Sequence, residues 1–248
     1  MACNMDGRSY LLRINLPKLH IAFIGEAMQR RQMLLSTLAL LGSGGAVAAG
    51  PGAPVAVYVV PLDDVPEALS ATVAHALARQ LGIRVRAGMR LPPLRLPLLP
   101  GTQQVTGEAL LERAARASAR LPGLVPQTYR LFLTGRDINA QAGGFRFQFS
   151  MHSPNLKCSV VSMARLFEIV DGEPRLTDRT GERTVKLAKR AVGELHLGWQ
   201  RSTDPDDLMY APLMGLEDLD RIGNVHREEK PDEPAPAMQR KSRALIEV

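Results

Sequence analysis

The sequence predicts one α+β domain with an α/β-like N-terminal part, in which packing helices cover a mixed, twisted sheet. β-branched apolar runs alternate with amphipathic helical segments in the first half of the chain. Several strand candidates then cluster before the last helices, and this order distinguishes an α+β fold from a purely alternating one. The chain has 248 residues, 45% hydrophobic and 23% charged, which suits a soluble protein with one well-formed core.

The domain begins with two strands that flank a helix. Residues 54–62 form a short β-branched apolar run, which is typical of a central strand. Apolar residues then recur at helical spacing, so we expect a helix over residues 66–81, with Gly82 at its end. Residues 83–91 alternate apolar side chains with arginine, which indicates a strand with one face in solvent.

The rest of the domain contains a second helix, a group of strands and two final helices. Residues 92–107 are rich in proline and are predicted to be a loop, and residues 107–121 form an amphipathic helix. Three strand candidates follow, over residues 128–135, 145–151 and 158–166. Helical patterns over residues 182–197 and 215–223 complete the domain.

The first 49 residues have the features of an export leader. A complete signal runs from Met28 to Gly50, and it begins with a charged pair, Arg30 and Arg31. Met33–Leu41 is its apolar stretch, and Ala46–Ala48 is a small-residue cleavage site. The arginine pair is similar to that of bacterial twin-arginine signals, which implies export of the folded protein to the periplasm or the medium.

Three expectations follow from this leader. Residues 1–27 precede a complete signal, so they come from a start codon assigned too early, and the mature chain begins near residue 49 or 50. The apolar stretch is shorter than the roughly 20 residues of a membrane span, so we expect no stable span after signal removal. An uncleaved amphipathic N-terminus is the alternative.

Charge and cysteine content argue against a nucleic-acid partner and against a zinc site made of cysteines. The net charge is +6, but residues 1–49 hold five basic and two acidic residues and account for +3 of it. The remaining excess is too small to predict a nucleic-acid partner. Cys3 lies in the leader and leaves Cys158 alone, so we expect no internal disulfide and no cysteine zinc site. Residues 227–248 are charged and Pro-rich and are predicted to be disordered, which leaves residues 50–226 as the folded domain.

The strongest functional signal lies in the last third of the chain. The segment "STDPDDLMYAPL", residues 202–213, is similar to the methionine turn of matrixins, with Met209 and Tyr210 as its Met-Tyr pair. Gly198 suits the turn glycine that follows a zinc-binding helix. Upstream, "GRDINAQAGGFRFQFS" and "CSVVSMARL" are similar to archaemetzincin segments. The chain therefore resembles a divergent archaemetzincin-like metzincin over residues 54–223.

This resemblance implies a metzincin-like fold with a zinc helix and a methionine turn. It also implies zinc as the cofactor and a peptide or protein as the substrate. In such a peptidase Glu194 would be the general base that takes a proton from a zinc-bound water. His196 would be one of the zinc ligands.

The ligand positions depart from the family pattern. Compared with a family-like "AVHELGHLLGLQH", the segment "AVGELHLGWQR" has Gly193 in place of the first histidine and Arg201 in place of the third. Glu194 is retained, but one residue is missing before His196 and another before Gly198. On a regular helix Glu194 and His196 would lie about 200° apart, so they could share a metal only if the helix were distorted.

Other residues could rebuild a metal site. His152 follows the predicted strand 145–151, which in this family lies near the active-site cleft. The turn supplies Asp204, with Asp206 and Asp207 beside it, and some metzincins use aspartate as the third ligand. A site made of His196, His152 and one of these carboxylates is one interpretation. The other is that His152 and the aspartates are surface residues of a loop and a solvated turn.

Two functions remain open from the sequence. The first is an exported zinc metallopeptidase with a remodelled site, which hydrolyses peptide bonds if it binds metal. The second is an inactive pseudopeptidase that binds peptides along an edge strand. Sequence damage in residues 191–201 is a third explanation of the missing ligands. The oligomeric state is not predicted.

Overall fold

The computed structural model describes residues 54–63, 65–142 and 144–227. The leader (residues 1–49) and residues 228–248 of the tail lie outside the described residues. Export, the start at Met28 and the disorder of the tail therefore remain predictions. In the described part of the chain, no helix combines the length and the apolar character that a membrane crossing requires.

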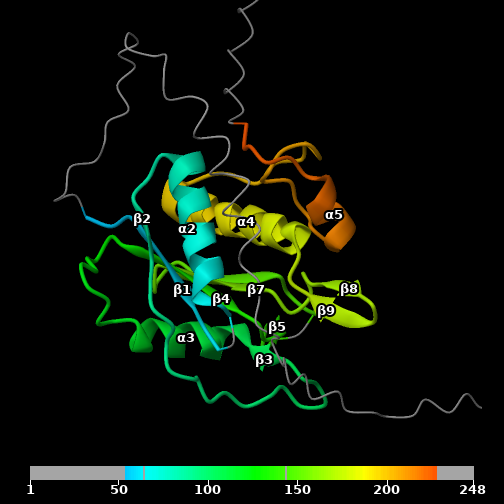
Figure 1. The fold of residues 1–248 in the computed structure, drawn as a ribbon, viewed down its shortest axis with the longest axis horizontal. Helices are drawn as coiled ribbons and strands as arrows, with labels where there is room; N and C mark the ends of the chain where they lie inside the picture. Colours follow the sequence, from blue (N-terminus) through cyan, green and yellow to red (C-terminus); the bar gives the residue numbers. More distant parts are fainter. Residues whose placement is uncertain (1–53, 64, 143, 228–248) are drawn as a thin grey trace, which may run out of the picture. The chain divides into compact units, whose positions relative to one another are not determined.

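A five-stranded sheet forms the centre of the domain, with strand order β2-β1-β4-β7-β6 (Figure 1). Four of its strands run parallel, and β6 is an antiparallel edge strand. The central strands β1, β4 and β7 are buried almost throughout, as expected for apolar runs covered on both faces. The bounds are β1 Val57–Pro61, β2 Val85–Ala87, β4 Tyr129–Thr134, β6 Ser150–Ser153 and β7 Cys158–Ser162.

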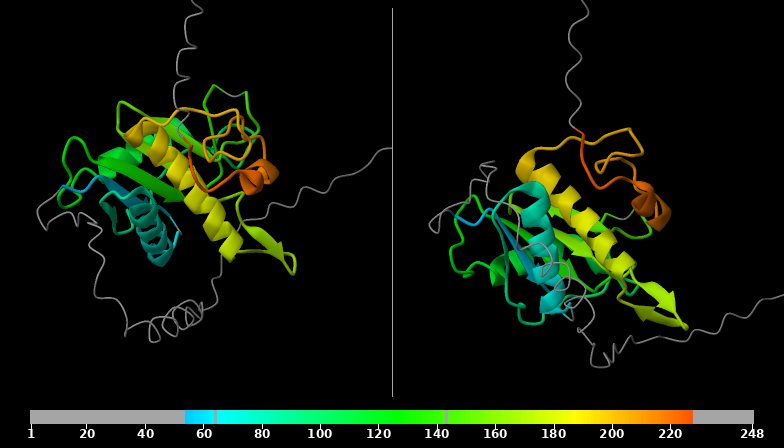
Figure 2. Two further views of the ribbon diagram at one scale, coloured as in Figure 1. Left: turned by 90° about the horizontal axis from the view of Figure 1, so that it is seen from above. Right: turned by 45° about the horizontal axis from the view of Figure 1, so that its top comes forward.

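Helices cover both faces of this sheet and make three layers. Helices α2 (Glu67–Leu81) and α4 (Asp178–Val192) pack against one face, and Figure 2 shows them together on that side. Helix α3 (Gly107–Ala117) packs against the opposite face. The alternation of strand side chains produces the two cores, because Leu131 and Leu133 contact the first layer and Phe132 the second. The α+β prediction with a mixed sheet is thereby confirmed.

The remaining elements are short. Strands β3 and β5 pair in parallel, β8 and β9 form an antiparallel hairpin, and α5 follows the methionine-bearing turn. Their bounds are β3 Val105–Thr106, β5 Ile138–Asn139, β8 Glu168–Val170, β9 Glu173–Arg175 and α5 Leu216–Arg221. The hairpin was not predicted, although Asp171 and Gly172, both with positive φ, form the Asp-Gly turn that favours one.

Two strand predictions were too long. The predicted strand 83–91 is reduced to β2, and of the predicted strand 145–151 only the end enters the sheet, as β6. Residues 145–149 instead cross over β5, where Gln148 donates a backbone hydrogen bond to Ile138. Asn139 also donates to the carbonyl of Phe145. These contacts turn the segment away from the sheet, which pattern alone does not indicate.

The predicted helix 182–197 ends differently from a regular helix. Helix α4 starts earlier, with a capping box between Thr177 and Thr180, and its last turn widens into a π-helical turn, η1 (Gly193–Leu197). Gly198 ends this turn with φ 76°, a left-handed conformation that favours glycine. The ring of Trp199 folds back over Gly193, so a Cβ placed on Gly193 would lie 2.0 Å from Cε3 of Trp199.

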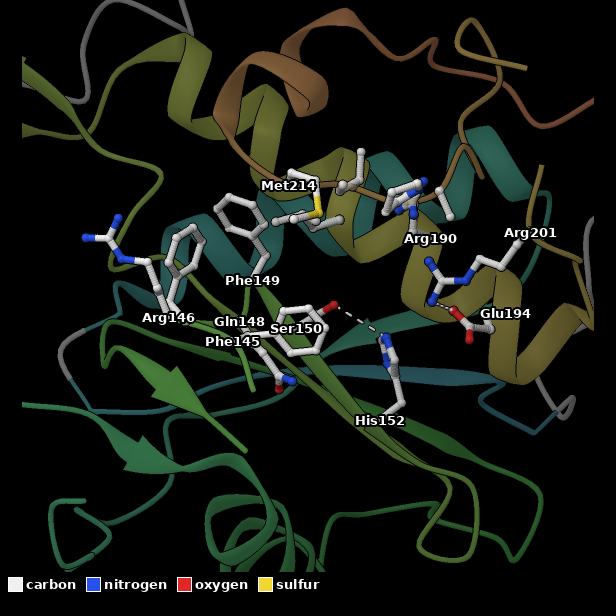
Figure 3. Close-up of a pocket in the computed structure, with 15 residues that line it drawn as sticks. Phe145, Arg146, Gln148, Phe149, Ser150, His152, Arg190, Glu194, Arg201 and Met214 are labelled. Atoms are coloured by element: carbon white, nitrogen blue, oxygen red, sulfur yellow. Dashed lines mark hydrogen bonds and ion pairs between the residues drawn. The ribbon is translucent and has the colours of Figure 1, made fainter. Parts of the chain in front are cut away.

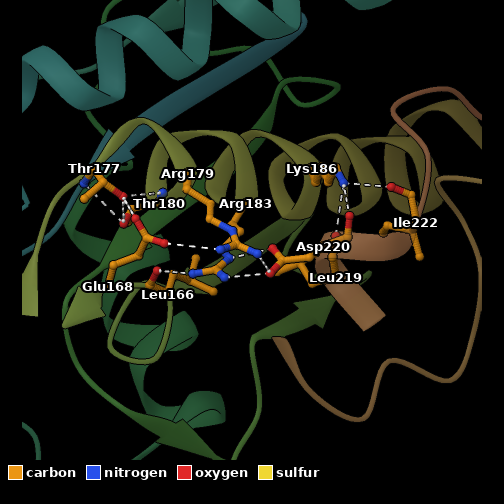
Figure 4. Close-up of polar contacts among 10 residues, drawn as sticks. All are labelled: Leu166, Glu168, Thr177, Arg179, Thr180, Arg183, Lys186, Leu219, Asp220 and Ile222. Carbon is orange, nitrogen blue, oxygen red and sulfur yellow. Dashed lines mark hydrogen bonds and ion pairs between the residues drawn. The ribbon is translucent and has the colours of Figure 1, made fainter. Parts of the chain in front are cut away.

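A charged contact fastens α5 to α4 (Figure 4). The guanidinium of Arg183, which is only 7% exposed, donates twice to the Asp220 carboxylate at 2.7 Å. Arg183 also donates to the carbonyl of Leu166, and Lys186 donates to three carbonyls at the end of α5. The contact with Arg183 lowers the pKa of Asp220 below its ordinary value of 3.8.

We expect Gly193→Ala to destabilise the protein by about 1–3 kcal/mol, because the new methyl group overlaps the Trp199 ring. Gly181→Ala is the matched control, since it lies in the same helix with open space around the added carbon. It should stabilise the protein by about 0.5–1 kcal/mol through helix propensity. Urea unfolding followed by circular dichroism measures both changes. Equal effects of the two substitutions would contradict the described packing of Trp199.

We also expect Asp220→Asn to cost about 2–4 kcal/mol at neutral pH, because it leaves the Arg183 cation buried without its partner. Asp218→Asn is the control, since its partner Arg221 is 54% exposed, and it should cost less than about 1 kcal/mol. Because the pKa of Asp220 is lowered, its contribution is complete above pH 3.8 and is lost as the pH falls through the lowered value. The difference in unfolding free energy between wild type and Asp220→Asn should therefore be smaller at pH 3 than at pH 7. The same difference at both pH values would disprove the linkage.

Candidate functional site

A cavity of about 390 Å³ opens between β6, α4 and the segment after Met209 (Figure 3). We call it the α4–β6 cavity, and its volume is within the range of ligand sites. Glu194 and His152, two of the predicted site residues, share it. Its lining residues are Phe145, Arg146, Phe147, Gln148, Phe149, Ser150, His152, Leu187, Arg190, Glu194, Arg201, Ala211, Pro212, Leu213 and Met214.

Glu194 is held at this cavity by an ion pair with Arg201 (Figure 3). The guanidinium of Arg201 donates to Oε2 of Glu194. Arg201 stands where the family pattern has its third histidine ligand, so a permanent cation takes the place of a neutral ligand. The carboxylate predicted to act as a general base is therefore already bound to a positive charge.

His152 lies in the same cavity as a neutral imidazole. Its Nδ1 lies 2.5 Å from Oγ of Ser159, and its Nε2 lies 3.4 Å from Oγ of Ser150. The pKa of His152 is lowered to about 4, mainly by burial; Glu194 opposes this shift, and Arg201 and Arg190 add to it. At pH 7 the imidazole is uncharged and does not add to the positive charge of the cavity.

A polar chain connects His152 to α4. Ser159 accepts a hydrogen bond from the Tyr129 hydroxyl, which also lies 3.3 Å from the carbonyl oxygen of Ala191. Burial raises the pKa of Tyr129 above its ordinary value of 10, so it remains a hydroxyl donor at neutral pH. These hydrogen bonds connect β6, β7, β4 and α4, and they fix the orientation of the His152 ring.

His196 lies outside the lining of the α4–β6 cavity. Its ring is tilted against Tyr129 with 6.3 Å between the centroids. Partial burial lowers the pKa of His196. Of the two residues of the π-helical turn predicted to act together, Glu194 lines the α4–β6 cavity and His196 does not.

The methionine-bearing turn is formed by residues 202–211. Ser202 donates to the carbonyl of Met209 at 3.1 Å, and Ala211 donates back to Ser202 at 3.0 Å. Met209 is fully buried, while Tyr210 is partly exposed with Arg221 above its ring. The turn is tied to the end of α4 next to Met209, because Arg190 donates to the carbonyl of Leu208.

The aspartates of this turn serve local structure. Asp204 accepts from the backbone of Asp206 and lies 3.6 Å from the guanidinium of Arg227. Asp207 is buried and would have a raised pKa by burial alone, but donors around it lower its pKa overall. These donors are the backbone N–H groups of Arg227 and Met209 and the ring of His226.

The residues present do not fit a zinc ion. Within residues 54–63, 65–142 and 144–227, the structure brings no three His, Cys, Asp or Glu side chains together as a metal site. His152 faces the cavity, His196 contacts Tyr129, and Asp204 belongs to the turn, so the suggested rebuilt site is not assembled. Trp199 covers the position of the first ligand, and Arg201 places a cation at the third. A structural zinc site needs four ligands and a catalytic one three.

Sequence reasoning missed Arg190 and the aromatic wall as parts of the site. Arg190 is only 5% exposed, and burial lowers its pKa to about 10, so it is still a cation at pH 7. Phe145, Phe147 and Phe149 are three of the six phenylalanines in the chain and alternate within five residues. In a protein with only 4% aromatic residues, this cluster was a usable signal.

Comparisons with known proteins give matches only at the level of structure. No known family model matches the chain, and no curated protein matches it. A zinc-dependent peptidase from Methanocorpusculum labreanum has 22% identity and a TM-score of 0.58, over 69% of this chain and 96% of that one. Archaemetzincin from Methanopyrus kandleri has 22% identity and a TM-score of 0.55, over 73% and 93%. The resemblance predicted from the motifs is therefore confirmed for the fold: this chain is structurally similar to the archaemetzincins.

Proposed function

We propose that this protein is a pseudopeptidase that binds peptides beside β6 and does not cleave them by zinc chemistry. The observation that carries the proposal is the ion pair of Glu194 with Arg201 at the α4–β6 cavity. The similar solved structures include a zinc-dependent peptidase, which supports a peptide as the ligand class. We further propose, from the leader alone, that the protein acts outside the cytoplasm.

Hydrolysis by a metal-activated water requires groups that this site does not supply. The metal needs three protein ligands, and a free carboxylate must accept the proton of the bound water. Here Arg201 engages the Glu194 carboxylate, and its positive charge would repel a divalent cation at that point. The packing of Trp199 on Gly193 also leaves no room for a side chain at the first ligand position.

Peptide binding requires an open strand edge, and β6 provides one. Among the described residues, β6 pairs with β7 on one side only. Phe149 accepts a backbone hydrogen bond from Ser162, so the antiparallel register alternates from there along the strand. The backbone groups of Ser150 and His152 consequently face away from β7 and are free to pair with an added strand.

The peptidase alternative is favoured by the fold similarity and by the retained Glu194. It makes an opposite prediction about metal and cleavage. We expect the purified protein to bind a pool of fluorescent peptides equally well with and without a chelator, and to leave them intact. Anisotropy measures the binding, and mass spectrometry of the peptides detects cleavage. Cleavage that a chelator stops and that Glu194→Gln abolishes would establish the peptidase instead.

The role of the edge can be tested in β6 itself. Ser150→Pro removes an outward-facing N–H from the edge strand, so we expect peptide affinity to fall by about 2–10-fold, the value of one hydrogen bond. Ser150→Ala removes only the hydroxyl and should leave the affinity nearly unchanged. Thermal unfolding shows whether both variants fold. Equal affinities of the two variants would exclude strand addition at Ser150.

A further inference from the structure

Arg190 is a buried cation that forms no ion pair within the described residues, although the charges of Glu194 and Asp207 act on it at longer range. It lies in the last turn of α4, and among the described residues its only hydrogen bond runs from Nη1 to the carbonyl of Leu208. No carboxylate of the described chain lies within ion-pair distance of it. Glu194 is engaged by Arg201, and Asp207 by His226 and backbone donors. Buried arginines are normally paired, so Arg190 has capacity for an anion that this part of the chain does not supply.

The free side of Arg190 opens into the α4–β6 cavity. Arg190 lines this cavity, and Figure 3 shows it between Met214 and Arg201. In the described residues, the only fully enclosed side-chain nitrogen or oxygen without a partner is Nε of Arg130. The unpartnered nitrogens of Arg190 are therefore not sealed inside the protein. They are accessible from the space that the cavity lining encloses.

The charge of the cavity favours an anion over a cation. Its lining carries the guanidiniums of Arg190 and Arg201 against the single carboxylate of Glu194, while the guanidinium of Arg146 points away from them (Figure 3). His152 is uncharged at neutral pH, because burial lowers its pKa. Arg201 already balances Glu194, so the balance left for a ligand is positive and is centred on the buried Arg190.

The walls of the cavity select an apolar group next to that anion. Phe149 and Leu187, which are buried, and Pro212, Leu213 and Met214 supply its apolar lining. A phosphate, with its larger charge and no apolar part, would leave these walls unused. A carboxylate bonded to a carbon that carries an apolar side chain satisfies both the guanidinium and the walls.

We propose that the α4–β6 cavity binds the C-terminal carboxylate of a peptide, with Arg190 as the carboxylate-binding residue and an apolar last side chain against the walls. The inference rests on the proposed peptide binding, and it adds the end of the ligand that is recognised. A peptide paired with Ser150 and His152 on the edge of β6 lies beside the cavity, since both residues also line it. The C-terminus of the bound peptide therefore lies next to Arg190.

The test compares one peptide in two forms on the full-length protein. A fluorescent pentapeptide that ends in leucine is titrated as the free acid and as the C-terminal amide. We expect the acid to bind at least about tenfold more tightly, which is typical of a hydrogen bond to a charged group. In Arg190→Gln the acid should lose this advantage, so that both forms bind alike. Arg79→Gln, an exposed arginine of α2, is the matched control and should behave as wild type.

The possible outcomes separate this inference from the proposed function. Equal binding of acid and amide to wild type would overturn the inference and leave peptide binding intact. No binding of either form would overturn the proposed function and the inference with it. N-acetyl-leucine binding as tightly as the pentapeptide would show a free carboxylic acid as the ligand and overturn the peptide source. If Arg190→Gln fails to fold, Arg190→Lys, which keeps the charge without the fork, must still reduce the acid-to-amide ratio.

Discussion

The ion pair between Arg201 and Glu194 is the contact on which the chemistry of this fold depends. It places a permanent guanidinium charge where the family pattern has a metal ligand, so the positive charge next to Glu194 comes from Arg201. The change at the first ligand position is matched in the same way, because Trp199 packs over the bare face of Gly193. Both positions that differ from the family pattern, Gly193 and Arg201, thus take part in a specific contact of their own.

The proposed peptide binding rests on two features beside this contact. The sheet keeps its antiparallel edge strand β6, and the cavity beside it keeps an apolar wall and a buried arginine. The turn of residues 202–211 buries Met209, and Arg190 connects this turn to the end of α4. The proposed binding depends on the edge and the cavity, whereas hydrolysis would depend on metal ligands that the described residues do not assemble, so the two are separable.

Much of the fold followed from local patterns, and much of the site did not. Helix α2 with its Gly82 end and the buried strands β1, β4 and β7 follow from apolar periodicity, which depends on neighbours in sequence. The turn at Met209 was predicted from its motif. The π-helical turn that carries Glu194 and His196 was not predicted, and the pitch of a regular helix does not apply to it. Arg190 and the Trp199 contact could not be predicted, because both depend on how distant segments pack.

Metal content tests the central claim most directly. The full-length protein, purified without chelator and equilibrated with zinc, can be measured by inductively coupled plasma mass spectrometry after removal of free metal. The account predicts no stoichiometric zinc, in wild type and in His196→Ala alike, because Arg201 and Trp199 occupy the ligand positions. About one zinc ion per chain, lost in His196→Ala, would contradict it and would show that the ligands assemble around the metal.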